Sequence, residues 1–124
     1  MVKILYVEDN EYNRKIVRQL LKNQPYELEF AADGESGVRM AIETRPDLIL
    51  MDVQLPKLSG LEATRMLRAD ERTRDIPVLV ITSFALSGDC QRATEAGAVG
   101  YLAKPYSPRE LLTLVQRFLP EEGP

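Results

Sequence analysis

Five short apolar segments rich in β-forming residues recur along the chain. They read VKILYV (2–7), YELEFA (26–31), DLILMD (47–52), PVLVIT (77–82) and VGYLAK (99–104). The first, third and fourth are almost continuously apolar, which is typical of strands covered on both faces. The second alternates polar and apolar residues, which favours a strand nearer the edge of a sheet. The pattern predicts five strands.

The stretches between these segments have the spacing of amphipathic helices. Apolar residues fall on one helical face at Ile16, Val17, Leu20 and Leu21 in the first stretch, and at Val38, Ala41 and Ile42 in the second. The second stretch stops at Arg45–Pro46, because the residue before a proline disfavours helix. The fourth runs from about residue 87 to residue 96, and Gly97 is placed as its C-cap.

Two of the helix starts have the spacing of a capping box. Ser59 precedes Glu62 by three residues, and Ser107 precedes Glu110 by the same distance. Pro108 also occupies the favoured first helical position. Five strands therefore alternate with five helices, which implies right-handed crossovers and a parallel sheet. We expect one α/β domain over residues 1–120, followed by a short tail at 121–124.

The composition is that of an ordinary single domain. The chain has 124 residues, of which 44% are hydrophobic and 28% charged. Its longest apolar runs are far shorter than the about 20 residues of a membrane span. Acidic residues follow the first apolar segment at once, so no signal peptide is indicated. The net charge of −3, without a basic cluster, disfavours nucleic-acid binding. We expect a cytoplasmic protein without nucleic-acid or membrane partners.

Two residue counts narrow the possible chemistry. Cys90 is the only cysteine, which excludes an internal disulfide and a multi-cysteine metal site. The absence of histidine excludes Ser-His-Asp catalysis and histidine-based zinc binding. A small residue on a helix is a better interpretation of Cys90 than a redox sensor.

Polar side chains follow four of the predicted strands, at the point where each strand ends. They are Glu8 and Asp9 after the first, Asp52 at the end of the third, Thr82 at the end of the fourth, and Lys104 at the end of the fifth. Ligands of open parallel sheets bind at the carboxyl ends of the strands. Each residue alone has an ordinary structural explanation, but their joint placement predicts one site.

Three carboxylates at one place repel one another, so the pKa of at least one should rise unless a cation is bound. Mg²⁺ favours such hard oxygen ligands. One carboxylate could then attack phosphorus while Lys104 and Thr82 hold the phosphoryl oxygens, which would give an aspartyl phosphate.

Four motifs in order resemble the receiver domain of two-component response regulators. They are VEDN after the first strand, DLILMDVQLPKLSG around the third, IT closing the fourth, and YLAKP at the fifth. The resemblance runs from about Lys3 to Leu119. It implies a flavodoxin-like (βα)5 fold with strand order 2-1-3-4-5. It also implies that Asp52 is the phosphoacceptor and that Mg²⁺ is bound by Glu8, Asp9, Asp52 and the backbone carbonyl of Gln54.

The same resemblance assigns the remaining residues of the site. It makes Thr82 similar to the switch hydroxyl, Tyr101 to the switch aromatic and Lys104 to the invariant lysine, with a cis Lys104–Pro105 bond. The implied protein is not an enzyme beyond supporting its own phosphoryl transfer and slow self-dephosphorylation. A histidine kinase or histidine phosphotransfer protein would donate the phosphoryl group, and a downstream protein target would recognise the phosphorylated form.

Two departures from the usual receiver pattern leave the required groups intact. Ser83 follows the switch hydroxyl where receivers often have Ala, and Gln54 stands two residues after the acceptor where Met or Asn is common. A haloacid-dehalogenase-like phosphatase or phosphotransferase is the alternative from another class. It normally has a second acid at the position of Gln54, which argues against it. A flavodoxin is disfavoured because Glu8 and Asp9 would repel the phosphate of FMN.

Within the family, the motif MDVQLPKLSGLEATR resembles both stand-alone regulators of the DivK type and receivers of hybrid kinases. Met1 stands directly before the first strand, which favours a free single-domain regulator over an excised receiver. We expect a monomer or a weak dimer.

Two further sets of residues are predicted around the site. The kinase is expected to dock on the first helix and on the loop after Lys104, through Asn13, Arg14, Val17, Leu20, Tyr106 and Pro108. Gln54 and Phe84 each lie two residues beyond a site residue and are expected to slow hydrolysis, since neither is a good general base. Packing of Phe84 on the fourth helix is the alternative.

Overall fold

The computed structural model describes residues 2–83 and 88–119 and contains five alternating pairs of strand and helix. The strands are β1 (Val2–Val7), β2 (Tyr26–Ala31), β3 (Leu48–Asp52), β4 (Val78–Thr82) and β5 (Gly100–Ala103). The helices are α1 (Glu11–Leu21), α2 (Gly34–Thr44), α3 (Gly60–Ala69), α4 (Asp89–Ala96) and α5 (Pro108–Phe118). None of the helices in the described ranges is both long and apolar enough to cross a lipid bilayer.

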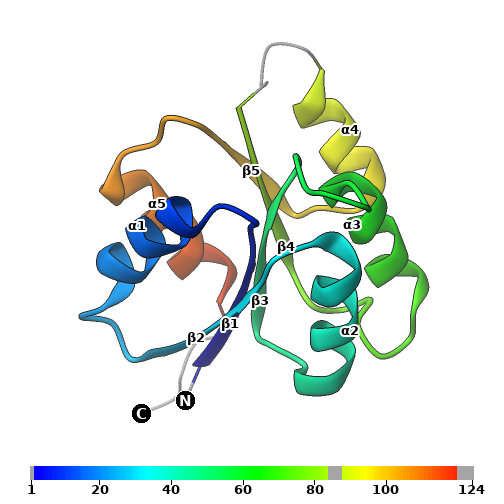
Figure 1. The fold of residues 1–124 in the computed structure, drawn as a ribbon, viewed down its shortest axis with the longest axis horizontal. Coiled ribbons are helices and arrows are strands. Elements are labelled where there is room, and N and C mark those ends of the chain that lie inside the picture. Colours follow the sequence, from blue (N-terminus) through cyan, green and yellow to red (C-terminus); the bar gives the residue numbers. More distant parts are fainter. Residues whose placement is uncertain (1, 84–87, 120–124) are drawn as a thin grey trace.

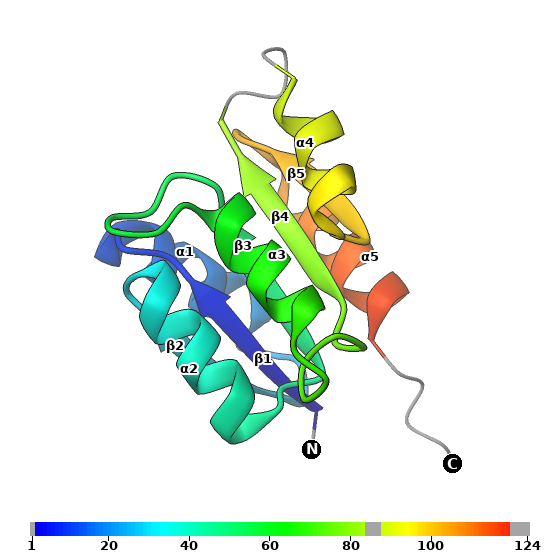
Figure 2. The same ribbon diagram turned by 90° about the vertical axis from the view of Figure 1, so that its right-hand side faces the viewer.

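The five strands form one parallel sheet in the order β2-β1-β3-β4-β5, as predicted. Helices α1 and α5 cover one face, and α2, α3 and α4 cover the other (Figures 1 and 2). Strand order reverses between β1 and β3, because β2 lies outside β1 while the chain continues on the other side. Ligand sites of such sheets form beside this reversal, beyond the carboxyl ends of the strands.

The last three strands are shorter than predicted, although the backbone pairing extends beyond their ends. The N–H of Asp47 donates to the carbonyl of Lys3, and the carbonyl of Pro77 accepts from Ile49. On β5, the N–H groups of Val99 and Lys104 both donate to β4. The apolar runs therefore located the strands correctly, and the terminal residues make ladder hydrogen bonds without belonging to the strands proper.

The helix ends follow the predicted capping chemistry. The Ser107 hydroxyl and the Glu110 side chain form the reciprocal capping box, and Pro108 is the first residue of α5. Ser59 accepts a hydrogen bond from the Glu62 N–H at the start of α3. Gly97 ends α4 with a φ of 105°. Helix α4 begins at Asp89, and the predicted start near residue 87 lies outside the described residues.

Alternation along the strands divides the core into two layers. Tyr6, Leu50 and Ile81 pack on the side of α1 and α5. Val7, Met51 and Val80 pack on the side of α2, α3 and α4. The same alternation places Asp52 on the α1–α5 side, two residues beyond Leu50. It places Thr82 on the opposite side, two residues beyond Val80.

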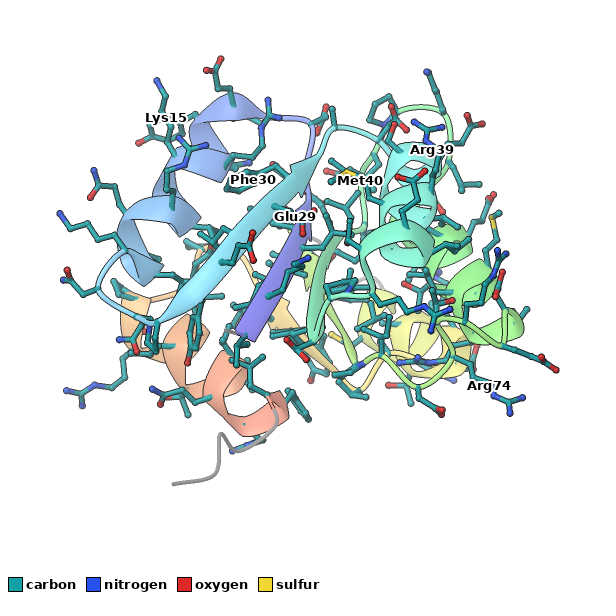
Figure 3. The ribbon with its side chains drawn as sticks, turned by 90° about the horizontal axis from the view of Figure 1, so that it is seen from below. Lys15, Glu29, Phe30, Arg39, Met40 and Arg74 are labelled. Carbon is teal, nitrogen blue, oxygen red and sulfur yellow. The ribbon has the colours of Figure 1, made fainter. Side chains whose placement is uncertain are left out.

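The edge strand β2 carries an ion pair on one face and a cation–π contact on the other. Glu29 forms an ion pair of 3.3 Å with Lys3 on the neighbouring strand. Phe30 lies on the side of β2 that faces α1 (Figure 3), where the guanidinium of Arg18 is 4.9 Å from the centre of its ring. Charged residues on an edge strand discourage pairing with a second chain. The alternating sequence of this segment correctly predicted its edge position.

Candidate functional site

The centre of the site is a buried contact between Lys104 and two carboxyl groups. The Lys104 Nζ donates to Asp52 Oδ2 at 3.0 Å and lies 3.9 Å from Glu8 Oε1. Only 5% of Asp52 and 1% of Glu8 is exposed. These residues come from the ends of β3, β1 and β5, so the sheet brings together groups that are distant in the sequence. A cation between two buried carboxyls offsets part of the cost of their burial.

Glu8 carries the clearest electrostatic signature of the site. Burial, followed by a hydrogen bond with Asp52, raises the pKa of Glu8 to about 8, while Asn13 and Lys104 act in the opposite direction. The Asn13 side chain donates to Glu8 Oε1. A raised pKa within this group was predicted from repulsion among carboxylates. In the structure, burial contributes more than that repulsion.

The predicted metal ligands have been brought together only in part. Asp9 is exposed, and no three acidic, histidine or cysteine side chains in residues 2–83 and 88–119 form a group ready to hold a metal ion. Glu8 Oε2, however, is buried and accepts no hydrogen bond from the described residues. A buried carboxylate oxygen without a donor, next to Asp52, fits a hard cation such as Mg²⁺. The metal site stays a prediction.

The loop after β3 packs back on the end of the strand and contacts the Asp52 carboxylate. The N–H of Gln54 donates to Asp52 Oδ1 at 3.0 Å, and the N–H of Gly60 donates to the Val53 carbonyl at 2.9 Å. Gly60 approaches so closely that a Cβ atom built on it would lie 1.9 Å from the carbonyl oxygen of Asp52. Lys57, in the same loop, has a φ of 69°. The loop therefore closes on the end of β3 through a position that only glycine fits.

We expect Gly60→Ala to destabilise the domain, because the added methyl would overlap the Asp52 carbonyl, a backbone atom without room to move. Overpacking of this kind typically costs about 1–3 kcal/mol. Urea denaturation would measure the loss in the free energy of unfolding. Arg65→Ala is the control, since Arg65 is exposed on the same helix. Equal stability of the two variants would show that the loop tolerates the methyl.

Sequence reasoning missed the role of Gly60. The sequence analysis placed Ser59 at a helix start and assigned no role to the glycine that follows it. The only signal in the sequence was a glycine directly after an N-cap residue, at the end of the loop that follows Asp52. That pattern does not show how close the two backbones come.

Thr82 and Tyr101 lie on the same side of the sheet, beneath α4. Thr82 pairs with Ala103 in the β4–β5 ladder, and Tyr101 pairs with Val80. Thr82 and Tyr101 are therefore diagonal neighbours on one face. Thr82 is buried, whereas 47% of Tyr101 is exposed. This placement agrees with the predicted pair of switch residues, whose coupled movement remains a prediction.

A groove of about 470 Å³ opens beside Lys104, between the start of α1 and the start of the loop after β5. It is lined by Asn13, Ile16, Ser83, Lys104, Pro105 and Tyr106. The Lys104–Pro105 bond is cis, as the resemblance implied. The groove combines two predicted docking residues, Asn13 and Tyr106, with the lysine of the site.

One predicted docking residue was assigned wrongly. Val17 is fully buried in the core under α1, so it cannot contact a partner at the surface. Leu20 is partly buried against the same layer of the core. Arg14 is partly exposed and Pro108 is exposed. An amphipathic pattern shows which face of a helix is apolar, but it does not separate the buried residues from those at the margin.

Only one of the two residues predicted to slow hydrolysis lies within the described part of the chain. The side chain of Gln54 is exposed, close to Asp52 through its backbone N–H. Phe84 lies outside the described residues.

Known proteins resemble this chain over nearly its whole length. The family model described as the response regulator receiver domain matches residues 4–116. The polar-differentiation response regulator DivK of Brucella anthropi is 41% identical over 116 residues, which cover 94% of each chain.

Solved structures agree with this match. The receiver domain of a sensor histidine kinase from Pseudomonas aeruginosa PAO1, solved with a magnesium ion in its active site cleft, is 42% identical. It has a TM-score of 0.88 and covers 94% of this chain and 96% of its own. The chemotaxis protein CheY4 of Vibrio cholerae is 34% identical with the same TM-score, covering 96% of this chain and 99% of its own. The motifs, the fold and these relatives agree, and the chain belongs to the family of response regulator receiver domains.

Proposed function

We propose that this receiver accepts a phosphoryl group on Asp52, with Mg²⁺, from a histidine kinase or a histidine phosphotransfer protein. It then signals by changing the surface that it presents to a downstream protein. The proposal is carried by one observation. Asp52 is a buried carboxylate at the end of a central strand, held 3.0 Å from the Lys104 ammonium and beside a second buried carboxyl.

The transfer step follows from this arrangement. An oxygen of Asp52 attacks the phosphorus of the phosphohistidine, an O–P bond forms as the N–P bond breaks, and the electron pair returns to the imidazole nitrogen. Negative charge then sits on the phosphoryl oxygens, next to the Asp52 position. Lys104 is close enough to pair with that charge, and the Thr82 hydroxyl can donate to it. Lys104 already contacts Asp52 before the reaction, and such preorganisation is the condition for electrostatic stabilisation.

The ligands proposed for Mg²⁺ are Glu8, Asp9, Asp52 and the backbone carbonyl of Gln54. When bound, the ion would supply positive charge against the transferring phosphoryl oxygens. The unpartnered Oε2 of Glu8 supports this assignment. The exposed position of Asp9 leaves its carboxylate open to solvent.

We expect Asp9→Ala to weaken Mg²⁺ binding, because one hard oxygen ligand is lost while the buried pair of Glu8 and Asp52 remains. A loss of about tenfold or more in affinity would be in keeping with the removal of one charged ligand. Titration followed by NMR or by intrinsic tyrosine fluorescence would measure it. Glu11→Ala is the matched control, since Glu11 is an exposed acid on the adjoining turn of α1. Equal affinities in the two variants would remove Asp9 from the metal site.

Transfer from the protein donor is proposed to use the groove beside Lys104. A phosphohistidine must reach Asp52 in line, and this groove opens next to the lysine that contacts it. Its lining includes Asn13 and Tyr106, with Arg14 close by in sequence. Val17 is not part of this docking surface, because it is buried.

We expect Arg14→Glu and Tyr106→Ala to slow phosphorylation by a histidine phosphotransfer protein while sparing phosphorylation by acetyl phosphate. The small donor needs only the site, whereas the protein donor also needs the surface around it. Truncation of an aromatic anchor in a small interface typically costs more than about 1 kcal/mol. Rates with both donors, measured side by side, separate the two effects. Equal losses with both would indicate a damaged site and not a docking surface.

A further inference from the structure

Arg68 connects α3 to two separate loops through backbone carbonyls. Its Nε donates to the carbonyl of Gly97 at 2.7 Å. Its Nη1 donates to the carbonyls of Arg74 at 2.6 Å and Ile76 at 2.7 Å. The side chain of Arg74 points away from the molecule (Figure 3), so that residue contributes its backbone alone. One guanidinium thus joins the end of α3, the approach to β4 and the end of α4.

These contacts suit arginine in particular. The guanidinium is a rigid planar fork with five donors, whereas lysine has a single flexible ammonium group. Hydrogen bonds from a charged donor are stronger than those between neutral groups. Arg68 is also partly buried, so water competes less for the same carbonyls. The proposed phosphoryl transfer makes no use of this residue.

The corner between α4 and β5, residues 97–99, lies against the side chain of Arg68. Gly97 has a φ of 105°, and a Cβ atom built on it would lie 2.5 Å from the Arg68 Cγ. The next two N–H groups are also paired: Ala98 donates to Ala93 at 3.0 Å, and Val99 donates to Val78 at 2.9 Å. This corner is therefore tied to α3, to β4 and to α4 itself. Figure 2 shows α3 and α4 on the same face of the sheet, with the corner between α4 and β5.

At the opposite end of α4, the described cap residue makes no side-chain hydrogen bond. Its N-cap is Gly88, with a φ of 87° and no side chain to accept from the first turn. The carbonyl of Gly88 accepts from the N–H of Arg92 at 3.0 Å, which is an ordinary helical bond. The two ends of this helix of eight residues therefore have different caps.

We propose that Arg68 is a positioning residue for the surface formed by α4 and β5. It holds the corner between these two elements fixed while phosphorylation of Asp52 changes the first half of α4 and the position of Tyr101. This inference rests on the proposed function. The change enters at Thr82, which ends β4 on the side covered by α4. With the corner fixed, α4 pivots at its C-terminal end. Without Arg68, the helix and the start of β5 would move together, and the orientation change would be smaller.

Amide hydrogen exchange of the unsubstituted protein gives the first test. Exchange is measured before and after phosphorylation by acetyl phosphate with Mg²⁺, with the intact mass recorded on the same sample. We expect the rates at Arg92 and Ala93 to change by about tenfold or more, while those at Gly97, Ala98 and Val99 stay within about twofold. Equal changes at both ends would overturn the pivot. A sample that gains no phosphoryl group would instead count against the proposed function.

Substitution of Arg68 gives the second test, and it needs no phosphodonor. In Arg68→Met we expect exchange at Ala98 and Val99 to rise about tenfold or more, because charge-assisted hydrogen bonds hold the corner. Arg68→Lys should show a smaller rise. Arg65→Met is the control, since Arg65 is an exposed arginine one turn earlier on α3.

The amide of Leu50, at the centre of the sheet, distinguishes a local effect from a global one. A rise at the corner with little change at Leu50 supports the anchor. Unchanged exchange at the corner, or an equal rise at Leu50, would overturn it.

Discussion

Asp52→Asn should abolish the gain of a phosphoryl group from acetyl phosphate in the presence of Mg²⁺. The substitution replaces a carboxylate by an amide of nearly the same size. The single amide oxygen can still accept from either Lys104 or the Gln54 N–H, whereas in Asp52 each of these donors has its own oxygen. The amide oxygen is a far weaker nucleophile towards phosphorus than the carboxylate. Intact-mass measurement at a series of times would follow the reaction, with the fold checked by circular dichroism.

Asp75→Asn is the control for this experiment. Asp75 is an exposed acid on the loop between α3 and β4, at the opposite end of β4 from the site, and its substitution changes the charge by the same amount. The control should react like the unsubstituted protein. Continued reaction of Asp52→Asn at the normal rate would mean that another residue accepts the phosphoryl group.

Lys104→Met should slow phosphorylation by about 10²-fold, because a preorganised charge at the transferring group is lost. The Lys104 Nζ lies within 4.0 Å of both Asp52 and Glu8, and no other salt bridge to either carboxyl is found among residues 2–83 and 88–119. Methionine keeps much of the length and apolar character of the lysine stem. Unlike Asp52→Asn, this variant retains the nucleophile and should still gain a phosphoryl group slowly. Rates from acetyl phosphate at fixed Mg²⁺ would measure the difference.

Lys57→Met provides the comparison for Lys104. Lys57 is exposed in the loop after β3, and its nearest acidic partner is Asp33 at 3.9 Å. Its substitution removes one positive charge near the same edge of the sheet and leaves the contacts of Asp52 unchanged. Equal rates for the two variants would show that Lys104 acts only through the overall charge of the protein and not through its contact with Asp52.

Local signals in the sequence predicted most of the fold. The capping box of Ser107 and Glu110 and the glycine cap at Gly97 depend on residues within a few positions of each other, and both are present. Alternation within the strands also decides which face each side chain takes, so the common side of Thr82 and Tyr101 follows from the strand positions once the sheet is known. The strand ends were less predictable, since ladder hydrogen bonds involve Asp47, Pro77, Val99 and Lys104, which lie just outside β3, β4 and β5.

Features that depend on close approach between distant segments could not be predicted. Arg68 contacts Gly97 across 29 positions of sequence, and an arginine on an amphipathic helix ordinarily lies in solvent. Gly60 looked like a simple helix start, although it abuts the carbonyl of Asp52. Val17 looked available to a partner, although it is enclosed in the core under α1. In each case the tertiary packing, and not the local pattern, determines the role.

The central claim is that Asp52 itself carries the phosphoryl group, and one measurement tests it most directly. The protein is incubated with acetyl phosphate and Mg²⁺, and the acyl phosphate is then reduced with borohydride, which converts a phosphorylated aspartate to homoserine. Tandem mass spectrometry of the peptide containing β3 locates the modified residue. We predict homoserine at position 52 and at no other aspartate. Phosphorylation of the intact protein with an unmodified Asp52, or with homoserine at another position, would contradict the claim.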